Sequence, residues 1–356
     1  MMTHRILAIN PGATSTKLAI FDDDNCLVRE VFEHSFAAGL SLLDELPIRK
    51  KVVHDFLATH LGEDEKLDAV VGRGGLLAPI AAGTYEVDQA MLDDLRRGQR
   101  GEHASNLGAF LAHLVAEKQD VPAYIVDPVS VDEMDDVARI SGLAGVERES
   151  LCHALNIRAV AHRFADDQNR RFDTLRLVVA HLGTGVSMAA IRDGRLVDVV
   201  NPRDEGPIGL DRPGALPNYG LLQRCFDPDL SRAELEKLLL GDGGVFSYLH
   251  TRDLRQVLQR AEQDDHQAAL LLQAMIYDTA KWIAAMASVL RGTLDAVLLT
   301  GGMARSDAFV DQLTNRIQWI APTFVYAGDG EDRALVEGAL RVLRGQSKAR
   351  RYADQI

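Results

Sequence analysis

The chain has 356 residues, 47% hydrophobic and 26% charged, which is enough to build two domains, each with a core of its own. Its formal net charge of −13 argues against nucleic acid or an anionic membrane as a main partner, although a few local cations could still define a phosphate site. Cys26, Cys152 and Cys225 are far apart and show no metal-ligand spacing, so we expect buried thiols in a reducing cytoplasm. The N-terminus passes straight into a strand, and we therefore expect no secretory signal.

The first half of the chain opens on a strand hairpin at residues 6–22, in which two apolar runs flank a turn of small and hydroxyl residues. Further elements are predicted in the order helix 43–61, strand 67–71, helix 104–117, strand 123–126 and helix 151–165. Strand 67–71 runs into Gly72-Arg73-Gly74-Gly75, and strand 123–126 delivers Asp127 to its end.

The second half begins with another hairpin, at 177–193, and continues with a loop rich in proline and glycine at 201–217. The remaining predicted elements are helices 232–240 and 268–290, strand 296–299, helix 307–319, strand 323–326 and helix 332–343. Helix 268–290 is the most apolar stretch, but Gln273, Asp278 and Lys281 interrupt it, which favours a buried helix over a membrane span. The tail after Arg344 is expected to be a solvated end.

The two hairpins repeat one pattern. Gly12 falls on Gly183, 171 positions later, and at the same offset Ala19 falls on Ala190 and Asp22 on Asp193. Small residues let backbone N–H groups approach an anion closely, although most such turns only connect strands. Two turns in register predict two related domains facing one nucleotide.

The alternation of hairpins, helices and strands predicts an α/β architecture, in which ligands gather at the carboxyl ends of strands. Five polar or glycine positions directly follow a predicted strand: Asn10, Arg73, Asp127, His181 and Gly301. We therefore expect these positions to converge on one ligand site.

Several segments together resemble the acetate and butyrate kinases of the acetokinase family, within the sugar kinase, Hsc70 and actin superfamily. The segments are N-P-G-A-T-S-T-K at 10–17, V-G-R-G-G at 71–75 with Y-E-V at 85–87, S-L-C-H-A-L-N at 150–156, E-G-P at 205–207 with D-R-P-G-A-L-P at 211–217, and T-G-G-M-A at 300–304. They occur in the family's order and spacing over roughly residues 5–345, which makes the resemblance specific. The length is nearer to the butyrate-kinase branch.

The chain departs from the butyrate-kinase pattern at three places. Ala13 replaces the usual serine, Asp211 stands where glutamate is usual, and H-L-G-T-G at 181–185 is nearer to the acetate-kinase form. These departures leave the reaction class intact but leave the preferred acid open.

The resemblance implies a two-domain actin-like ATPase (ribonuclease H-like) fold with a duplicated β-hairpin phosphate loop in each domain. The internal repeat sets the domain boundary, with residues 1–154 plus 332–356 in the first domain and 155–331 in a second, nucleotide-binding domain. The resemblance also implies ATP/ADP and Mg²⁺ as cofactors, a short-chain carboxylate and its acyl phosphate as small-molecule partners, a homodimer or higher homo-oligomer, and a cytoplasmic location without nucleic acid or membrane partners.

Site residues are implied by the same resemblance. The catalytic group is Arg73, Arg212, His153 and Asn10. The nucleotide-binding group is Gly12, Thr14, Ser15, Thr16, His181, Gly183, Thr184, Gly185, Gly301 and Gly302. The acid would contact Arg73, His103 and Pro207, and magnesium would bind Asp127 and Glu331.

The residues themselves leave alternatives open. Asp127 before Pro128 suits an Asx turn as well as a metal ligand, and Glu331 suits the first turn of a helix, with Asp332 as its rival for magnesium. Arg212 without the resemblance would be a solvated loop charge, and a lone histidine such as His153 is more often a core imidazole.

The leading hypothesis is a reversible kinase that transfers the γ-phosphoryl group of ATP to a short-chain fatty acid, with butanoate as the expected acid. The alternatives are an acetate or propionate kinase, a sugar kinase in which Asp127 accepts the hydroxyl proton, and a non-catalytic nucleotide-binding regulator.

Overall fold

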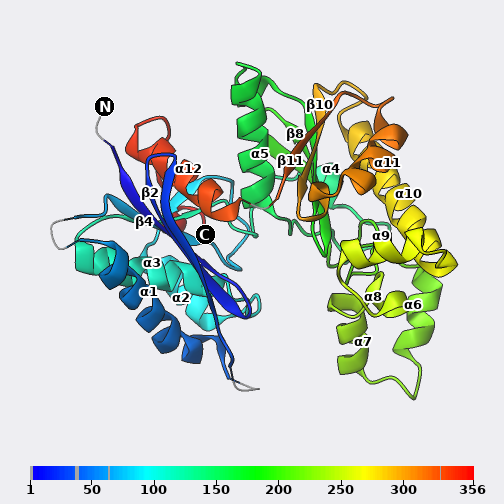
Figure 1. Ribbon diagram of the computed structural model, residues 1–356, viewed down its shortest axis with the longest axis horizontal. Coiled ribbons are helices and arrows are strands. Elements are labelled where there is room, and N and C mark those ends of the chain that lie inside the picture. The colour runs from blue at the N-terminus through cyan, green and yellow to red at the C-terminus, as the bar shows by residue number, and fades with distance from the viewer. Residues whose placement is uncertain (1–2, 37–39, 63–64, 329) are drawn as a thin grey trace. The chain divides into compact units, whose positions relative to one another are not determined.

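The computed structural model describes residues 3–36, 40–62, 65–328 and 330–356. The chain forms two compact units: unit 1 is Met1–Asp132 with Gly330–Ile356, and unit 2 is Glu133–Asp329 (Figure 1). Each unit is built around a mixed sheet with helices on its faces, which confirms the predicted α/β class.

The boundary between the units lies at 132/133, earlier in the chain than the 154/155 position predicted from the repeat. Hydrogen bonds to β9 explain the shift. The N–H of Asp135 donates to the carbonyl of Val197 at 2.9 Å, and the N–H of Leu196 donates to the carboxylate of Glu133 at 3.1 Å. The segment that follows residue 132 is therefore attached to a strand of unit 2.

The sheet of unit 1 has the strand order β12-β5-β6-β4-β1-β2-β3. Its strands are β1 (Arg5–Pro11), β2 (Ser15–Asp22), β3 (Asn25–Glu33), β4 (Ala69–Arg73), β5 (Thr84–Glu86), β6 (Ala123–Val126) and β12 (Arg350–Arg351). β1, β4 and β6 are parallel neighbours, and Ile9 lies opposite Gly72, which lies opposite Ile125. The carboxyl ends of these three strands therefore lie level with one another.

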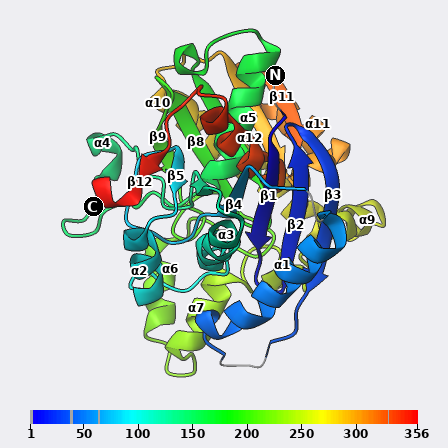
Figure 2. The ribbon, with the colours of Figure 1, turned by 90° about the vertical axis from the view of Figure 1, so that its left-hand side faces the viewer.

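Helices cover both faces of this sheet (Figure 2). They are α1 (Leu46–His60), α2 (Gln89–Arg97), α3 (Asn106–Gln119) and α12 (Glu331–Leu343). Leu7 and Ile9 of β1 share a core with residues of α1 and α3. On the other face α12 approaches β6 so closely that a Cβ on Gly338 would lie 2.4 Å from the side chain of Val126.

The sheet of unit 2 has the order β11-β10-β7-β8-β9. Its strands are β7 (Leu177–Leu182), β8 (Val186–Arg192), β9 (Arg195–Val200), β10 (Ala296–Gly301) and β11 (Thr323–Ala327). Its helices are α4 (Asp136–Arg139), α5 (Ala154–Asp167), α6 (Asn218–Cys225), α7 (Arg232–Leu240), α8 (Phe246–Leu249), α9 (Leu254–Glu262), α10 (His266–Val289) and α11 (Asp307–Ile317).

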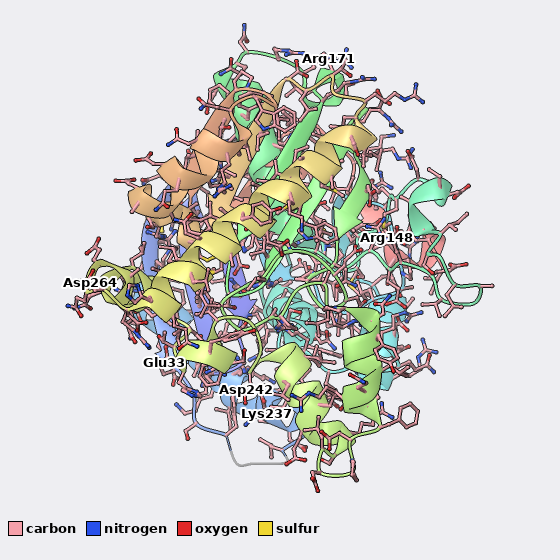
Figure 3. The ribbon with its side chains drawn as sticks, turned by 90° about the vertical axis from the view of Figure 1, so that its right-hand side faces the viewer. Glu33, Arg148, Arg171, Lys237, Asp242 and Asp264 are labelled. Atoms are coloured by element: carbon pink, nitrogen blue, oxygen red, sulfur yellow. The ribbon has the colours of Figure 1, made fainter. Side chains whose placement is uncertain are left out.

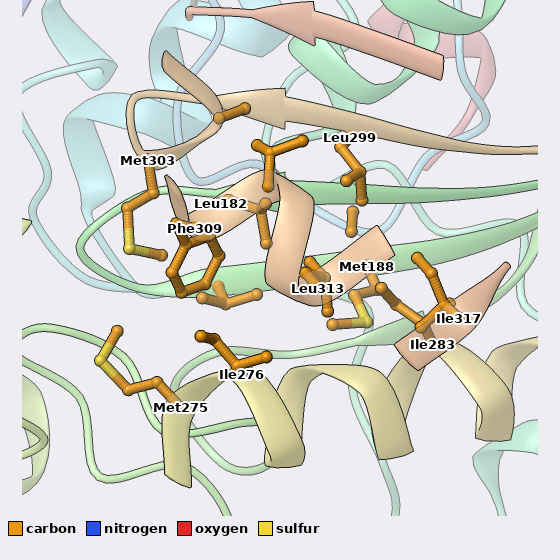
Figure 4. Close-up of a cluster of buried hydrophobic side chains, with 14 of the residues drawn as sticks. Leu182, Met188, Met275, Ile276, Ile283, Leu299, Met303, Phe309, Leu313 and Ile317 are labelled. Atoms are coloured by element: carbon orange, nitrogen blue, oxygen red, sulfur yellow. The ribbon is translucent and has the colours of Figure 1, made fainter. Parts of the chain in front are cut away.

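The core of unit 2 lies between the sheet and helices α10 and α11 (Figure 4). Met275 and Ile283 of α10 belong to one core cluster with Phe309 of α11 and Met188 of β8. All four residues are fully buried. The prediction that helix 268–290 is buried is thus confirmed for its inner face, whereas Tyr277 of the same helix is 55% exposed. Among the described helices, none is both long and apolar enough to cross a membrane.

The duplicated hairpin extends to a third strand in each unit. β1-β2-β3 and β7-β8-β9 are antiparallel meanders, each with a register shift between its last two strands. Pro11 pairs with Thr16 in the first meander, and Leu182 pairs with Val186 in the second. The second turn is therefore one residue shorter.

This shorter turn corrects the predicted superposition. Gly12 still matches Gly183, but beyond the turn the offset is 170, so that Ala19 corresponds to Ala189. At this offset Asp23 corresponds to Asp193. Both residues have a left-handed backbone, with φ of 50° and 54°.

Two smaller expectations were wrong. The tail after Arg344 is not a solvated end, because β12 pairs with β5 and Tyr352 is fully buried. The Tyr352 hydroxyl accepts the N–H of Ala78 at 3.0 Å and donates to Asp94, and burial together with that carboxylate raises the pKa of Tyr352 to about 12. Of the cysteines, only Cys152 is buried, whereas Cys26 and Cys225 are exposed.

Candidate functional site

Three residues predicted from separate motifs meet in unit 1. The amide nitrogen of Asn10, near the end of β1, donates to Oε2 of Glu331 at 2.7 Å. Nη1 of Arg73, at the end of β4, lies 2.7 Å from Oε1 of Glu331 and donates to Oδ1 of Asn10 at 3.4 Å. Glu331 begins α12, so a residue from the C-terminal part of the chain completes a cluster at the carboxyl ends of β1 and β4.

Glycines hold Arg73 in place by close packing. A Cβ on Gly108 of α3 would lie 2.2 Å from the carbonyl oxygen of Arg73, and a Cβ on Gly74 would lie 2.5 Å from Pro128. Gly75 is equally tight against Asn106, at 2.3 Å. The glycines around Arg73 thus fit β4 against its neighbours, and a side chain at Gly108 would collide with the backbone of Arg73.

Asp127 follows β6, the strand next to β4, and is 4% exposed. Its Oδ1 accepts the N–H of Gly83 at 2.7 Å, while its own N–H donates to the Gly83 carbonyl at 3.0 Å. Its φ is +37°, an unusual backbone for a residue other than glycine. The carboxylate is thereby oriented by the segment that leads into β5.

Glu331 and its rival Asp332 have different neighbours. Glu331 contacts Asn10 and Arg73, whereas Asp332 forms an ion pair with Arg29 of β3, whose side chain is 53% exposed. The geometry therefore associates Glu331, and not Asp332, with the other predicted site residues.

The turn at residues 12–15, which we call loop 1, is closed on itself. The N–H of Gly12 donates to the carbonyl of Ser15 at 2.7 Å, and Thr14 is exposed, with its carbonyl accepting the N–H of His34. The side chain of Thr16 is fully buried, and its hydroxyl contacts Arg49 and His34 at 2.9 and 2.8 Å, while its nucleotide-binding role stays a prediction. Thr16 supports the loop from within.

His103, predicted to contact the acid, is exposed and lies just before α3. Its Nδ1 lies 2.8 Å from the hydroxyl of Ser105 and accepts the Ser105 N–H at 3.2 Å. These contacts order the turn that leads into α3.

In unit 2 the two predicted histidines are stacked. The rings of His153 and His181 lie 3.9 Å apart with an angle of 11° between their planes. Nδ1 of His181 lies 2.9 Å from Oδ1 of Asn156, and Nδ1 of His153 lies 2.8 Å from the hydroxyl of Ser187.

The turn at residues 183–185, which we call loop 2, lies beside Arg212. A Cβ on Gly185 would be 3.3 Å from Cγ of Arg212, and the carbonyl of Thr184 accepts the N–H of Leu210 at 2.8 Å. Among the described residues, the buried Nε of Arg212 has no hydrogen-bond partner, and its contact with Oδ1 of Asp211 is long, at 3.5 Å. A buried N–H without an acceptor is costly, so this guanidinium is suited to an anionic ligand.

Gly301 is the last residue of β10 in unit 2 and Gly302 follows it, and Thr300 of that strand lies level with His181 of β7. Gly301 has φ +91°, and its N–H donates to the carbonyl of Gly328 at 3.2 Å. Pro207 is buried against Gly214, where an added Cβ would lie 2.7 Å from the Pro207 carbonyl.

The structure brings the predicted strand-end residues together within each unit, as register and hydrogen bonds show. The expectation that residues of both units face one nucleotide stays a prediction. The described residues contain no group of three or more histidine, cysteine, aspartate or glutamate side chains placed to hold a metal.

Sequence reasoning missed Arg49 and its partner Glu45. Arg49 is fully buried and contacts loop 1 with its guanidinium. A signal was present, because position 49 falls within the apolar stripe of helix 43–61, between Leu46 and Val53. A charged residue inside such a stripe indicates a buried ion pair.

Comparison with known proteins gives a family match for part of the chain. Residues 145–320, which carry both stacked histidines, loop 2 and Arg212, match the model of the acetokinase family. This segment is therefore similar to the acetokinase family.

Solved structures extend the fold comparison to nearly the whole chain. The chain is similar to acetate kinase of Porphyromonas gingivalis (TM-score 0.79, 18% identity, 96% of this chain and 100% of that chain). It is also similar to a propionate kinase of Francisella tularensis (0.77, 17%, 94% and 98%) and to acetate kinase of Entamoeba histolytica (0.76, 15%, 94% and 99%). The predicted two-domain α/β fold is thereby confirmed.

Proposed function

We propose that this protein is a magnesium-dependent kinase that transfers the γ-phosphoryl group of ATP to a short-chain carboxylate, with butanoate as the first acid to test. The acetokinase family match of residues 145–320 carries the proposal. Acetate or propionate is the alternative acid, supported by the likeness of the fold to an acetate kinase and a propionate kinase.

The chemistry needs no general base. A carboxylic acid is ionised at neutral pH, so a carboxylate oxygen can attack the γ-phosphorus directly. The new bond joins that oxygen to phosphorus, the bond between the γ-phosphorus and the bridging oxygen breaks, and ADP leaves with the electron pair. No proton moves, and the reverse reaction uses the same groups.

Two arginines supply the positive charge in this proposal. Arg73 is anchored by Glu331 and Asn10, and Arg212 offers a buried Nε that lacks a protein acceptor within the described residues. Fixed cations stabilise charge that spreads over the equatorial oxygens during transfer. Arg73 is also placed at a strand end, where it could bind the carboxylate of the acid in a bidentate manner.

Magnesium fits the oxygen donors of unit 1. Asp127 is a buried carboxylate oriented by Gly83, and magnesium in kinase sites commonly uses one or two protein carboxylates together with water and phosphate oxygens. Asp127 would hold the ion, with Glu331 next to Arg73 as the second carboxylate. When bound, the ion neutralises phosphate charge.

The decisive experiment measures ADP release and trapping of acyl phosphate as hydroxamate across C2 to C6 acids, with glucose and N-acetylmannosamine as sugar controls. Acid-dependent ADP release with matching hydroxamate supports the proposal, and the acid with the highest kcat/KM identifies the substrate. ADP release that depends on a sugar, or on no acceptor, would overturn it.

Magnesium dependence gives a separate prediction. Asp127→Asn keeps the shape of the side chain and an oxygen that can accept from Gly83, but it lacks the charge that holds a hard cation. We expect the magnesium concentration for half-maximal activity to rise about tenfold or more. An unchanged magnesium titration would assign Asp127 to a purely structural role.

A further inference from the structure

Behind loop 1 lies an arginine whose every N–H is used. Nη1 of Arg49 donates to the carbonyl of Ser15 and to the Thr16 hydroxyl, both at 2.9 Å, and Nη2 donates to the carbonyl of Gly12 at 2.9 Å. Nη2 and Nε also donate to Oε2 of Glu45, at 2.7 and 3.0 Å. The side chain of Arg49 is completely buried.

These contacts bind the turn at both of its ends. Gly12 and Ser15 are the first and last residues of loop 1, and the Ser15 carbonyl also accepts the Gly12 N–H at 2.7 Å. One rigid, planar group thus fixes the distance between the two ends of the turn. With its carbonyls held toward α1, the loop keeps Ala13 and Thr14 exposed.

Glu45 makes this burial possible. A buried guanidinium without a counter-charge would be strongly destabilising, and Glu45, one helical turn before Arg49, supplies the charge with a side chain that is only 13% exposed. The ring of Phe36 adds a cation–π contact, with its centre 5.0 Å from the guanidinium carbon. A hydrophobic residue at position 49 would fill the same stripe of α1 at a lower cost in free energy. Packing alone therefore does not explain the arginine.

We propose that Arg49, held by Glu45, is a positioning residue that sets the geometry of loop 1 for the phosphates of the nucleotide. This inference rests on the proposed function, which assigns Gly12, Thr14 and Ser15 to nucleotide binding. Arg49 itself touches no phosphate. It acts through the backbone of the loop, and its removal should therefore change nucleotide affinity and not acid affinity.

The test compares two arginines that contact the same hairpin, Arg49 from α1 and Arg5 from β1. Arg49→Lys keeps the positive charge but loses the fork, because one ammonium group cannot reach Gly12, Ser15, Thr16 and Glu45 together. The matched control is Arg5→Lys. Arg5 joins the far end of the hairpin, where Nε and Nη2 contact the two carboxylate oxygens of Asp22 at 2.7 and 2.9 Å.

Magnesium-ADP binding is measured by isothermal titration calorimetry, and steady-state kinetics give KM for ATP and for the acid. For Arg49→Lys we expect the Kd of magnesium-ADP and the KM of ATP to rise about tenfold or more, since hydrogen bonds from a charged donor to the loop are lost. The KM of the acid should stay within about threefold. Arg5→Lys should lower Tm while leaving the Kd of magnesium-ADP within about twofold.

A wild-type Kd in folded Arg49→Lys would overturn the proposal, as would an equal change for both variants. If Arg49→Lys does not fold, Glu45→Gln tests the same point, because it keeps an acceptor for Arg49 but removes the charge that holds it. We expect Glu45→Gln to raise the Kd of magnesium-ADP about threefold or more, and an unchanged Kd would equally overturn the proposal. Failure of the proposed function would instead appear as a parent protein that binds magnesium-ADP but forms no acyl phosphate.

Discussion

In unit 1 the turn between the first two strands of the meander is held from behind by one buried side chain, Arg49. In unit 2 the corresponding turn is one residue shorter and is held by backbone groups. The carbonyl of Thr184 accepts the N–H groups of Leu210 and Asp211, at 2.8 and 3.3 Å. Two turns with the same sequence pattern are thus held by different groups, the first by a guanidinium and the second by backbone hydrogen bonds.

The difference determines how each turn responds to substitution. A turn held by a guanidinium depends on one side chain and on the charges around it. A turn held by backbone contacts depends on close approach, and in unit 2 glycines provide it, since a Cβ on Gly209 would lie 2.5 Å from the Thr184 carbonyl. Side-chain chemistry should therefore govern loop 1, and backbone geometry should govern loop 2.

Unit 2 also contains an ion-pair network around Arg148, a residue that Figure 3 labels. Arg148 contacts Asp198 of β9 at 2.9 Å and Glu205 at 2.8 Å. Burial raises the pKa of Asp198, against the opposing charge of Arg148. These pairs attach residues 133–150 to β9 and support the chain just before Pro207.

The largest expected effect comes from the two arginines, one in each unit. Replacing Arg73 or Arg212 by alanine should remove about 3–4 kcal/mol of transition-state stabilisation, a loss of about 10²-fold or more in kcat. The measurement is kcat with saturating ATP and acid, with circular dichroism to verify folding. Activity within about threefold of the parent in either variant would remove that arginine from the mechanism.

The next prediction separates two neighbouring acids of α12. Glu331→Gln should lower kcat/KM about tenfold, because it removes the charge that anchors Arg73. Asp332→Asn, the matched control, breaks a pair with the half-exposed Arg29 and should change activity by less than about twofold. Equal effects of the two substitutions would mean that the Asn10–Arg73–Glu331 cluster has no special role.

The sequence predicted much of unit 1's site because the signals were local. Asn10, Arg73 and Asp127 each follow an apolar run that reads as a strand, and level parallel strands bring such positions together. Glu331 was harder to place, because nothing in a helix N-terminus shows that it will reach Asn10, 321 residues away. That contact depends on α12 returning to unit 1.

Other features escaped prediction for equally physical reasons. β3 and β9 alternate polar and apolar residues only weakly, and β5 and β12 are too short to show a period. The single-residue difference between loops 1 and 2 is invisible without pairing partners, because both strands remain apolar at either offset. Arg49 was overlooked because a charge in a helix is usually solvated.

Backbone control of unit 2 is tested at two adjacent glycines. Gly301 has φ +91°, and a Cβ there would lie 2.6 Å from the carbonyl oxygen of Leu182, so Gly301→Ala should lower the free energy of unfolding by about 2–4 kcal/mol. Gly302 has φ −64° and open space around its Cβ position, so Gly302→Ala should change stability by less than about 1 kcal/mol. The two variants are compared by urea unfolding. Equal midpoints would show that backbone strain at Gly301 does not limit the stability of unit 2.

The smallest expected effect tests side-chain control of loop 1 through pH. Nε2 of His34 lies 2.8 Å from the Thr16 hydroxyl, which accepts a hydrogen bond from Arg49. Burial and then the charge of Arg49 lower the pKa of His34 from its ordinary value of 6.5, with Glu45 and Glu33 opposing. The folded protein therefore binds fewer protons at His34 than the unfolded chain does near that pH. The resulting stability is present above pH 6.5 and is lost as the pH falls through the folded-state pKa.

His34→Gln removes this titration while keeping a polar group beside Thr16. We expect Tm to fall less between about pH 7.5 and about pH 5.5 in His34→Gln than in the parent, by roughly 2–4 °C. The matched control is His54→Gln on α1, where the side chain is 70% exposed and pairs loosely with Asp55 at 3.6 Å. That variant should follow the parent. If all three proteins lose the same Tm on acidification, His34 does not report on loop 1, and the pH dependence of the hairpin arises elsewhere.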